Sequence, residues 1–236
     1  MIEFKILHRL IRHMIVEIPN VLSHTQLSAV RPVLDQARFV DGKASAGRHA
    51  RRGKRNLELA SDENCIDALN NVVMTQLVQH PLYLQCAMPA KICAPIYARY
   101  SAGMGYAGHI DDPVMGPAQS RYRSDISITV FLNPPEEYEG GELCIESTQG
   151  IREIKLSAGD AVLYPSTHYH SVREVSSGNR LVAVTWVQSH IRRADQREIL
   201  VQLDRVRQQL GKDPEHPAYQ SLNLGYTNLY RMWAEL

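Results

Sequence analysis

The sequence has no apolar run that approaches the roughly 20 residues of a membrane-spanning helix. Its first 13 residues carry three basic side chains, but neither a continuous apolar stretch nor a small-residue cleavage site. We therefore expect no signal peptide. Met14 looks like an alternative start, which would make residues 1–13 an N-terminal extension.

Cysteine is scarce as well. The cysteines show no C-x-x-C spacing and are too few for a disulfide scaffold; they are Cys65, Cys86, Cys93 and Cys144. This usage is typical of reduced thiols, so we expect a cytoplasmic protein.

The chain has almost no net charge and few aromatic residues. Lys and Arg number 26 against 25 Asp and Glu, the formal net charge is +1, and aromatics make up 7%. Such a chain has no global electrostatic attraction to nucleic acid or membranes, and it offers few rings for base stacking. Because 44% of its residues are hydrophobic, it can nevertheless bury a core. Its 236 residues predict one large domain with an appendage.

Residues 20–90 read as mainly helical. One predicted helix begins at Ser23 and is kinked or interrupted by Pro32. Another is capped by Ser61 and ends at His80-Pro81. Its apolar stripe recurs at helical spacing: Ile66, Leu69, Val73 and Leu77.

The middle of the chain, about residues 91–189, changes to short β-type runs separated by Gly, Pro, Asn and Asp. The expected strands are 92–100, 126–132, 142–146, 151–156, 161–164, 170–175 and 180–187. Many short strands with turn signals predict an all-β sandwich or a jelly roll.

One constellation in this region can perform chemistry. His109 and Asp111 are two residues apart where a strand is expected, which would point both to the same side. His170 lies on a later expected strand, and Arg180 follows it by ten residues. Two histidines and one carboxylate on a small barrel are the metal ligands of non-haem Fe(II) oxygenases.

The formal charges of such a site are consistent with an acidic cosubstrate. Fe(II) bound by two neutral imidazoles and one carboxylate keeps one net positive charge, and a 2-oxoglutarate dianion reverses its sign. One guanidinium restores neutrality, and its planar fork suits a carboxylate better than a lysine does. Arg180 is the candidate, because it alternates with the apolar Val182 and Val184 and should face inward.

Each metal-binding position has a rival nearby. Asp112 competes with Asp111, but strand alternation would send it to the side away from His109. His168 shares strand parity with His170, so alternation does not separate these two.

The sequence resembles the PKHD-type hydroxylases, which belong to the prolyl/lysyl-hydroxylase-like Fe(II)/2-oxoglutarate dioxygenases. The resemblance covers about residues 14–236. It depends on an ordered set of motifs: Tyr100, Tyr106, His109-x-Asp111, Tyr138-Glu139-Gly140-Gly141-Glu142-Leu143, Ala158-Gly159-Asp160, Tyr164-Pro165-Ser166, His170-Ser171-Val172 and Arg180. It implies hydroxylation coupled to oxidative decarboxylation of 2-oxoglutarate to succinate and carbon dioxide.

The resemblance also implies roles for single residues. The iron ligands match His109, Asp111 and His170, where the family spacing favours His170 over His168. Arg180 matches the arginine that binds 2-oxoglutarate. Tyr100 matches a tyrosine that touches the cosubstrate, and Trp186 matches a tryptophan of the pocket wall. We add Thr129, on strand 126–132, as a candidate for the distal carboxylate of 2-oxoglutarate. L-ascorbate would act as a reductant.

The implied architecture is mainly β with flanking helices. We expect a dioxygenase domain over residues 14–189, with a double-stranded β-helix (jelly-roll) core at about 91–189. The N-terminal helices would pack on this core, and residues 190–236 would form a C-terminal helical appendage.

No motif names the substrate. A peptide side chain and a small molecule both fit, and some members of the family neighbour iron-uptake functions. Two other functions stay open: a non-catalytic iron-binding sensor or storage module, and an oxidative nucleic-acid demethylase. Six residues separate Arg173 from Arg180, unlike the five of the R-x5-R pattern of such demethylases.

Two segments are ambiguous. Residues 48–55 hold five Lys or Arg. We interpret them as a solvated loop; alternatively, they cover the mouth of the active site and attract an anionic substrate.

Two tail helices are expected within 191–210 and 219–236. Their apolar faces either pack on each other and the barrel, or form a homo-oligomer; they are Ile199, Leu203, Val206 and Leu210, and Leu222, Tyr226, Leu229, Tyr230 and Trp233.

Overall fold

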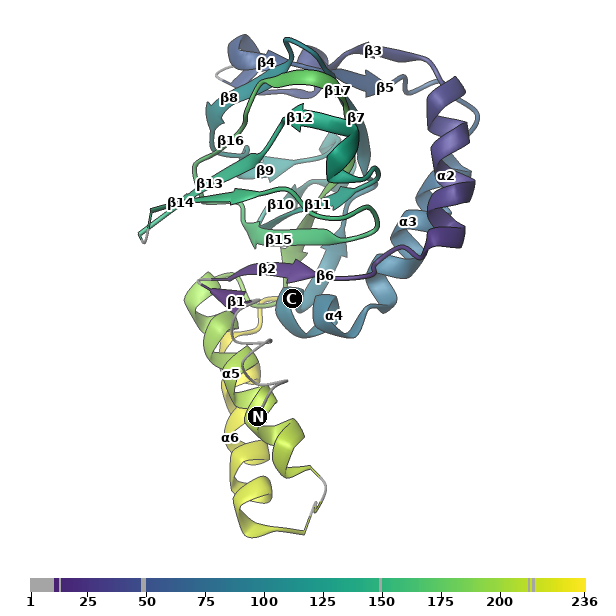
Figure 1. The fold of residues 1–236 in the computed structure, drawn as a ribbon. Helices are drawn as coiled ribbons and strands as arrows, with labels where there is room; N and C mark the ends of the chain where they lie inside the picture. Colours follow the sequence, from purple (N-terminus) through teal and green to yellow (C-terminus); the bar gives the residue numbers. More distant parts are fainter. Residues whose placement is uncertain (1–10, 13, 48–49, 149, 212, 214) are drawn as a thin grey trace.

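The computed structural model describes residues 11–12, 14–47, 50–148, 150–211, 213 and 215–236. The predicted N-terminal extension lies largely outside the described residues. Figure 1 shows two β-sheets that enclose a barrel, helices along one flank, and a helical pair that projects from one end of the barrel.

The larger sheet has ten strands, and its main path runs β1-β2-β15-β11-β17-β7-β5-β3, with β6 and β12 pairing with β17. Its strands are β1 (Ile11–Arg12), β2 (Ile15–Ile18), β3 (Phe39–Asp41), β5 (Leu57–Leu59), β6 (Pro89–Ile92), β7 (Ile96–Ser101), β11 (Ile126–Phe131), β12 (Tyr138–Gly140), β15 (Ala161–Pro165) and β17 (Val175–Ser189). All of its pairings are antiparallel.

The smaller sheet has the order β14-β13-β16-β8-β4. Its strands are β4 (Lys54–Arg55), β8 (Gly105–His109), β13 (Leu143–Ser147), β14 (Gly150–Ile154) and β16 (His170–Val172). A separate hairpin consists of β9 (Val114–Met115) and β10 (Tyr122–Arg123). These two facing antiparallel sheets confirm the predicted jelly roll.

Strand β17 is the longest and joins most of the larger sheet. It pairs with β11 from Val182 to Val187 and with β7 from Asn179 to Val184. The single strand expected at 92–100 is instead β6 and β7, because Cys93, Ala94 and Pro95 interrupt it. There the Cys93 carbonyl accepts a hydrogen bond from the Thr185 hydroxyl at 2.6 Å.

Two hydrophobic clusters lie on opposite faces of the larger sheet. The outer cluster joins the sheet to the helices, and the inner cluster fills the space between the two sheets. The alternation along β11 shows the division, since Ile128 and Val130 belong to the outer cluster and Phe131 to the inner one. Burial of apolar side chains on both faces is the main driving force for this arrangement.

The flanking helices are α2 (His24–Gln36), α3 (Ile66–Gln79) and α4 (Pro81–Ala87). Ser23 caps α2 as predicted, in a capping box with Gln26. The predicted interruption at Pro32 was wrong in one respect, because α2 continues through it to Gln36. The buried stripe of α3 is confirmed at Leu69, Val73 and Leu77.

Ser61 does not cap α3, which begins at Ile66 after Cys65. The two acidic residues that follow Ser61 bind Arg38: its guanidinium forms an ion pair with Asp62, and its backbone N–H donates to Glu63 at 3.3 Å. These contacts fix the segment to the chain near β3, outside the helix.

The tail forms α5 (Ala194–Leu210) and α6 (Pro217–Trp233), which pack against each other. The stripe predicted for the first of them was wrong, because Ile199 and Val206 are each 44% exposed. The buried face holds Leu200, Val201 and two polar residues, Arg197 and Asp204. Arg197 donates to the carbonyls of Ile191 and Arg192, and Asp204 accepts from Gln85, so polar contacts rotate the packed face away from the apolar stripe. Within the described part of the chain, no helix is long and apolar enough to cross a membrane.

Candidate active site

A cavity of about 430 Å³ opens between the two sheets. Both sheets, the β9–β10 hairpin and the segment 45–58 line it. The lining includes all the residues that the sequence analysis assigned a role in binding metal or cosubstrate: Tyr100, His109, Asp111, Thr129, His170, Arg180 and Trp186. The fold thus gathers residues from positions 100 to 186 into one chamber.

Three potential metal ligands meet in this cavity. The ligand atoms of His109, Asp111 and His170 all lie within 4.8 Å of one another. The Nε2 atom of each imidazole is 3.8 Å from Asp111 Oδ1, and all three side chains are at most 9% exposed. Strand pairing brings the imidazoles together, since His109 of β8 and His170 of β16 are register partners. Donor atoms at this spacing can share an ion with bonds of about 2.1 Å.

Backbone carbonyls fix the tautomer of both imidazoles. The Nδ1 atom of His109 lies 3.0 Å from the Ala107 oxygen, and that of His170 lies 3.0 Å from the His168 oxygen. Because a carbonyl only accepts hydrogen bonds, each Nδ1 carries the proton. Nε2 is therefore the nitrogen of each ring that is left for a metal ion, and in both rings it lies 3.8 Å from Asp111 Oδ1.

The Asp111 carboxylate is held by its other oxygen. Its Oδ2 accepts hydrogen bonds from the Ser127 hydroxyl and from the Trp186 indole N–H, the latter at 2.9 Å. The Ser127 Oγ also lies 2.7 Å from Ser166 Oγ. Since Oδ2 is occupied, Oδ1 is left for an ion. Trp186 was nominated as a wall residue, and here it also orients the carboxylate.

Aromatic rings surround the imidazoles. The Tyr106 ring stacks on His109 with centroids 3.8 Å apart, and the Tyr164 ring meets His170 edge-on at 5.2 Å. Burial, and then the neighbouring His170, lowers the pKa of His109 to about 4. A His109 imidazole with this pKa is neutral at pH 7 and available as a ligand.

Arg180 lies at the inner end of the cavity and is 1% exposed. Its guanidinium carbon is 5.1 Å from the centre of the Tyr100 ring and 5.5 Å from that of Phe131. Among the described residues no carboxylate forms an ion pair with it, and its Nε has no hydrogen-bond partner. A buried cation without a neighbouring carboxylate is costly, so this arginine is a candidate for binding an anionic ligand.

The other candidate residues differ in their relation to the cavity. Tyr100 is its register partner on β7, and burial raises the pKa of Tyr100 to about 12, which keeps the phenol protonated. Thr129 is 3% exposed and lines the same cavity. Asp112, the rival carboxylate, also lines the cavity but is exposed and is absent from the three-ligand cluster. His168 contributes its backbone oxygen to His170.

The basic segment 48–55 is not simply a solvated loop, as first interpreted. Lys54 and Arg55 form β4, paired with β8, and Lys54 is only 6% exposed because it forms an ion pair with Glu58. Arg51 and Arg52 are exposed, whereas Arg48 and His49 lie outside the described residues.

Sequence reasoning missed several cavity residues on this segment. Lys54, Asn56 and Glu58 are all buried and all line the cavity. The Ser45 hydroxyl joins the group, accepting from the Lys54 ammonium at 2.6 Å and donating to Glu58 at 2.8 Å. Their spacing of i, i+2 and i+4 is a strand signal, but the charge-rich surroundings concealed it.

Comparison with known proteins agrees with this geometry. Residues 95–188 match the model of the 2OG-Fe(II) oxygenase superfamily, and residues 195–235 match the PKHD-type hydroxylase C-terminal domain. A PKHD-type hydroxylase of Acaryochloris marina is 44% identical over 94% of this chain and 100% of its own length. One from Stutzerimonas stutzeri is 39% identical with the same coverage. The chain belongs to the PKHD-type hydroxylases.

This membership makes the chain a 2-oxoglutarate-dependent dioxygenase, an oxidoreductase that takes 2-oxoglutarate and dioxygen as cosubstrates. Among solved structures, a prolyl hydroxylase of Trichoplax adhaerens, in complex with a peptide of hypoxia inducible factor, superposes with a TM-score of 0.57. It is 20% identical and the match covers 82% of this chain and 91% of that one. At that identity the likeness concerns the jelly-roll fold, which it confirms for a PKHD-type hydroxylase.

Proposed function

We propose that His109, Asp111 and His170 hold Fe(II) and that Arg180 binds the distal carboxylate of 2-oxoglutarate in the same cavity. The observation that carries the proposal is the combination of a buried His-Asp-His cluster with a buried arginine that lacks a carboxylate partner within the described residues. Two neutral imidazoles and one carboxylate fit Fe(II), which when bound supplies the activation of dioxygen.

The chain itself positions the reactants and excludes water. Arg180, with Tyr100 beside it and with Thr129 in the same cavity, would fix one end of the cosubstrate, while Ser127 and Trp186 keep Asp111 in place at the other. Part of the cavity wall is apolar, since Leu143, Val172 and Val184 line it. Such a lining protects reactive species from water. L-ascorbate is proposed as the reductant that maintains Fe(II).

An anaerobic titration tests the metal and cosubstrate assignment. Fe(II) and 2-oxoglutarate together should produce a weak visible metal-to-ligand charge-transfer band. His109→Ala and Asp111→Ala should abolish it, whereas Asp112→Asn should retain it, because Asp112 lies outside the ligand cluster. A wild-type protein without the band would contradict the assignment.

The substrate is proposed to be a peptide side chain or a small molecule, with an iron-uptake compound among the latter. Succinate formation should be followed while peptide and small-molecule fractions of a cell extract are offered separately. Stimulation by one fraction alone assigns the class. Iron binding without any 2-oxoglutarate turnover would instead indicate a sensor or storage module.

We also propose residues 14–189 as the dioxygenase domain and 190–236 as a separate helical segment of a cytoplasmic protein. The four cysteines are free, as a reducing compartment requires. The tail is proposed to form a homo-oligomer. The predicted face of α6 is partly used internally, since Tyr226, Leu229, Tyr230 and Trp233 pack on the outer cluster.

Apolar side chains that remain exposed on the helical pair are the proposed contact between copies. Leu224 and Met232 are 65% and 75% exposed. Light scattering at micromolar concentration should show a dimer or larger species that Leu224→Glu with Met232→Glu dissociates. A wild-type monomer would contradict the oligomer.

A further inference from the structure

One wall of the active-site cavity is the β9–β10 hairpin. Val114, Met115, Gly116 and Tyr122 from this hairpin line the cavity, and the hairpin begins three residues after Asp111. Its two strands pair with each other in a sheet of their own, so the barrel strands do not fix its orientation through a ladder. Whatever holds its base therefore sets the shape of this wall.

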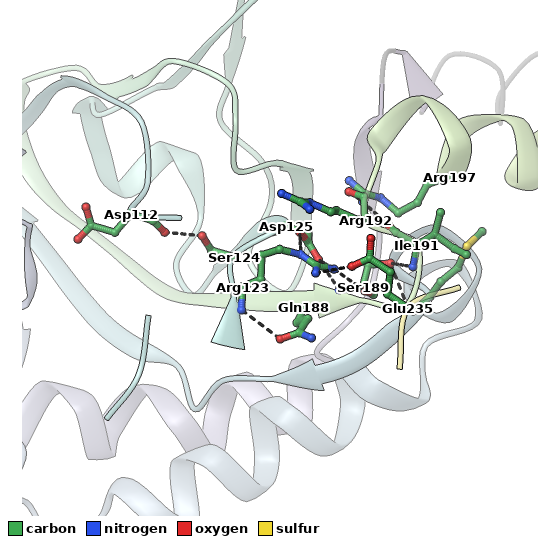
Figure 2. Close-up of polar contacts among 11 residues, drawn as sticks. Asp112, Arg123, Ser124, Asp125, Gln188, Ser189, Ile191, Arg192, Arg197 and Glu235 are labelled. Carbon is green, nitrogen blue, oxygen red and sulfur yellow. Dashed lines mark hydrogen bonds and ion pairs between the residues drawn. The ribbon is translucent and has the colours of Figure 1, made fainter. Parts of the chain in front are cut away.

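Hydrogen bonds close the base of the hairpin beside the proposed metal ligand. The Ser124 hydroxyl donates to the Asp112 carbonyl, and the Ser124 N–H donates to the Pro113 carbonyl at 3.2 Å. The Arg123 N–H donates to the side-chain oxygen of Gln188 on β17 at 3.0 Å. Figure 2 shows this row of contacts leading from Asp112 to the end of β17.

The Arg123 side chain connects this base to two carboxylates. Its Nε and Nη2 donate to the two oxygens of Asp125 at 2.6 and 3.0 Å, and its Nη1 donates to Glu235 at 2.6 Å. Nη2 also lies 3.3 Å from the Ser189 carbonyl oxygen. Asp125 is buried and accepts the Ser189 N–H as well, whereas the Glu235 side chain is 49% exposed.

Glu235 comes from the far end of the chain. After α6 the chain returns to the barrel, where Ala234 forms a β-bridge with Ile191 and the Glu235 N–H donates to the His190 carbonyl at 2.8 Å. Figure 1 shows the C-terminus back beside β6 and α4. The C-terminal segment thus supplies a carboxylate to the hairpin base, although no residue after Trp186 is among the described residues that line the cavity.

We propose that Glu235 is a positioning residue for the dioxygenase reaction: through Arg123 it holds the β9–β10 hairpin in the orientation that the substrate meets. The C-terminal helical pair acts on the active site by this route. The inference rests on the proposed function for its catalytic consequence, whereas the mechanical link between Glu235 and the hairpin is independent of it.

Glu235→Gln separates this role from folding. The variant keeps the side-chain shape and leaves the buried Arg123–Asp125 pair in place, and a half-exposed ion pair adds little to global stability. The matched control is Glu137→Gln. Glu137 pairs with Arg31 at 2.9 Å with side-chain exposures of 28% and 44%, close to the 24% and 49% of the Arg123–Glu235 pair, and neither residue lines the cavity.

Hydrogen exchange followed by mass spectrometry on the full chain reads out the hairpin directly. In Glu235→Gln, peptides covering residues 112–124 should exchange at least about threefold faster than in the wild type, and trypsin should cleave faster after the exposed Arg121. Glu137→Gln should change neither. In about 1 M NaCl the Debye length falls to about 3 Å. Under these conditions the hairpin peptides of the wild type should exchange faster, at a rate closer to that of Glu235→Gln. Unchanged hairpin exchange in Glu235→Gln, or equal acceleration in the control, would overturn the proposal.

Kinetics add the readout that a merely structural role would not move. With the extract fraction that stimulates succinate formation, Glu235→Gln should show a severalfold higher half-saturating amount of fraction, and Glu235→Asp should restore part of the loss. The Michaelis constant for 2-oxoglutarate should stay within about twofold. An equal increase in the half-saturating amount of fraction and in the Michaelis constant for 2-oxoglutarate would overturn the proposal. If no fraction stimulates the wild type, the proposed function fails, and hydrogen exchange still decides the link.

Discussion

The indole of Trp186 donates a hydrogen bond to Asp111 Oδ2 at 2.9 Å, and the residue lies on the same strand as Arg180. One strand thus contacts a proposed metal ligand near its end and carries the proposed cosubstrate arginine six residues earlier. A tryptophan expected only to line the wall is in this way part of the support for the metal site.

Trp186→Phe keeps the ring and removes the N–H donor. We expect about a tenfold weaker affinity for Fe(II) or Co(II), because among the described residues Ser127 is then the one side-chain donor left to Asp111 Oδ2. Metal titration checks this. Trp233→Phe on α6, the other tryptophan of the chain, should leave the affinity unchanged. Equal affinities in Trp186→Phe and the wild type would show that the bond does not orient the carboxylate.

Arg180→Met should affect binding and stability in opposite directions. Loss of charge-assisted hydrogen bonds should weaken 2-oxoglutarate binding by about 100-fold. The ligand-free protein should melt at a higher temperature, because the variant replaces a buried cation, which has no carboxylate partner among the described residues, by an apolar side chain. Calorimetric titration and thermal melts measure the two effects. Arg173→Met, at an exposed ion pair with Glu153, is the control and should change cosubstrate binding little.

Gly141→Ala should displace the Arg180 side chain, because the added Cβ would contact it. Gly141 has φ +69°, and a Cβ there would lie 3.0 Å from Arg180 Cδ. We expect a loss of about 1–2 kcal/mol of stability from the strained backbone, together with weaker 2-oxoglutarate binding. Gly150→Ala isolates the backbone effect, since Gly150 has φ +109° and no heavy atom within 4 Å of the added Cβ. If both variants bind 2-oxoglutarate like the wild type, contact with Arg180 is irrelevant.

Alkylation of the cysteines should report on the cavity. Burial raises the pKa of Cys86 to about 12, so at pH 8 only about one thiol in ten thousand is a thiolate, and its alkylation should be negligible in the native protein. The thiolate fraction of Cys86 rises as the pH approaches this pKa.

Cys93 lines the cavity, so a divalent metal with 2-oxoglutarate should slow its labelling by iodoacetamide. The partly exposed Cys65 lies outside the cavity lining and should be labelled at the same rate with or without them. Mass spectrometry of the labelled peptides decides.

The residues that could be predicted from the sequence are those with short, periodic signals. His109 and Asp111 belong to one cluster of ligand atoms, as their spacing predicted, and Arg180 is buried, as its alternation with valine indicated. The spacing of turns indicated an all-β sandwich or a jelly roll, and the resemblance to the hydroxylases favoured the jelly roll. These features depend mainly on neighbours along the chain. The expected strand, however, ends at His109, so that Asp111 lies two residues beyond β8.

Other features depend on partners far apart in sequence. Lys54 is buried because β4 pairs with β8, whose strand lies some fifty residues later, and because Glu58 neutralises it. Ser127 gave no signal of its own, since its importance comes from the position of Asp111. The same reason explains the wrong buried stripe in α5, where Arg197 and Asp204 find polar partners on the barrel side.

The uninterrupted register of β17 against β11 has a consequence for cosubstrate choice. From Val182 to Val187 the two strands pair without a bulge; Arg180 precedes that segment by two residues and Trp186 lies within it. We therefore expect the regular pairing of these strands to fix the distance between the guanidinium and the proposed iron. That distance should select the chain length of the keto acid. 2-Oxoadipate, one methylene longer, and oxaloacetate, one shorter, should both be poor replacements for 2-oxoglutarate.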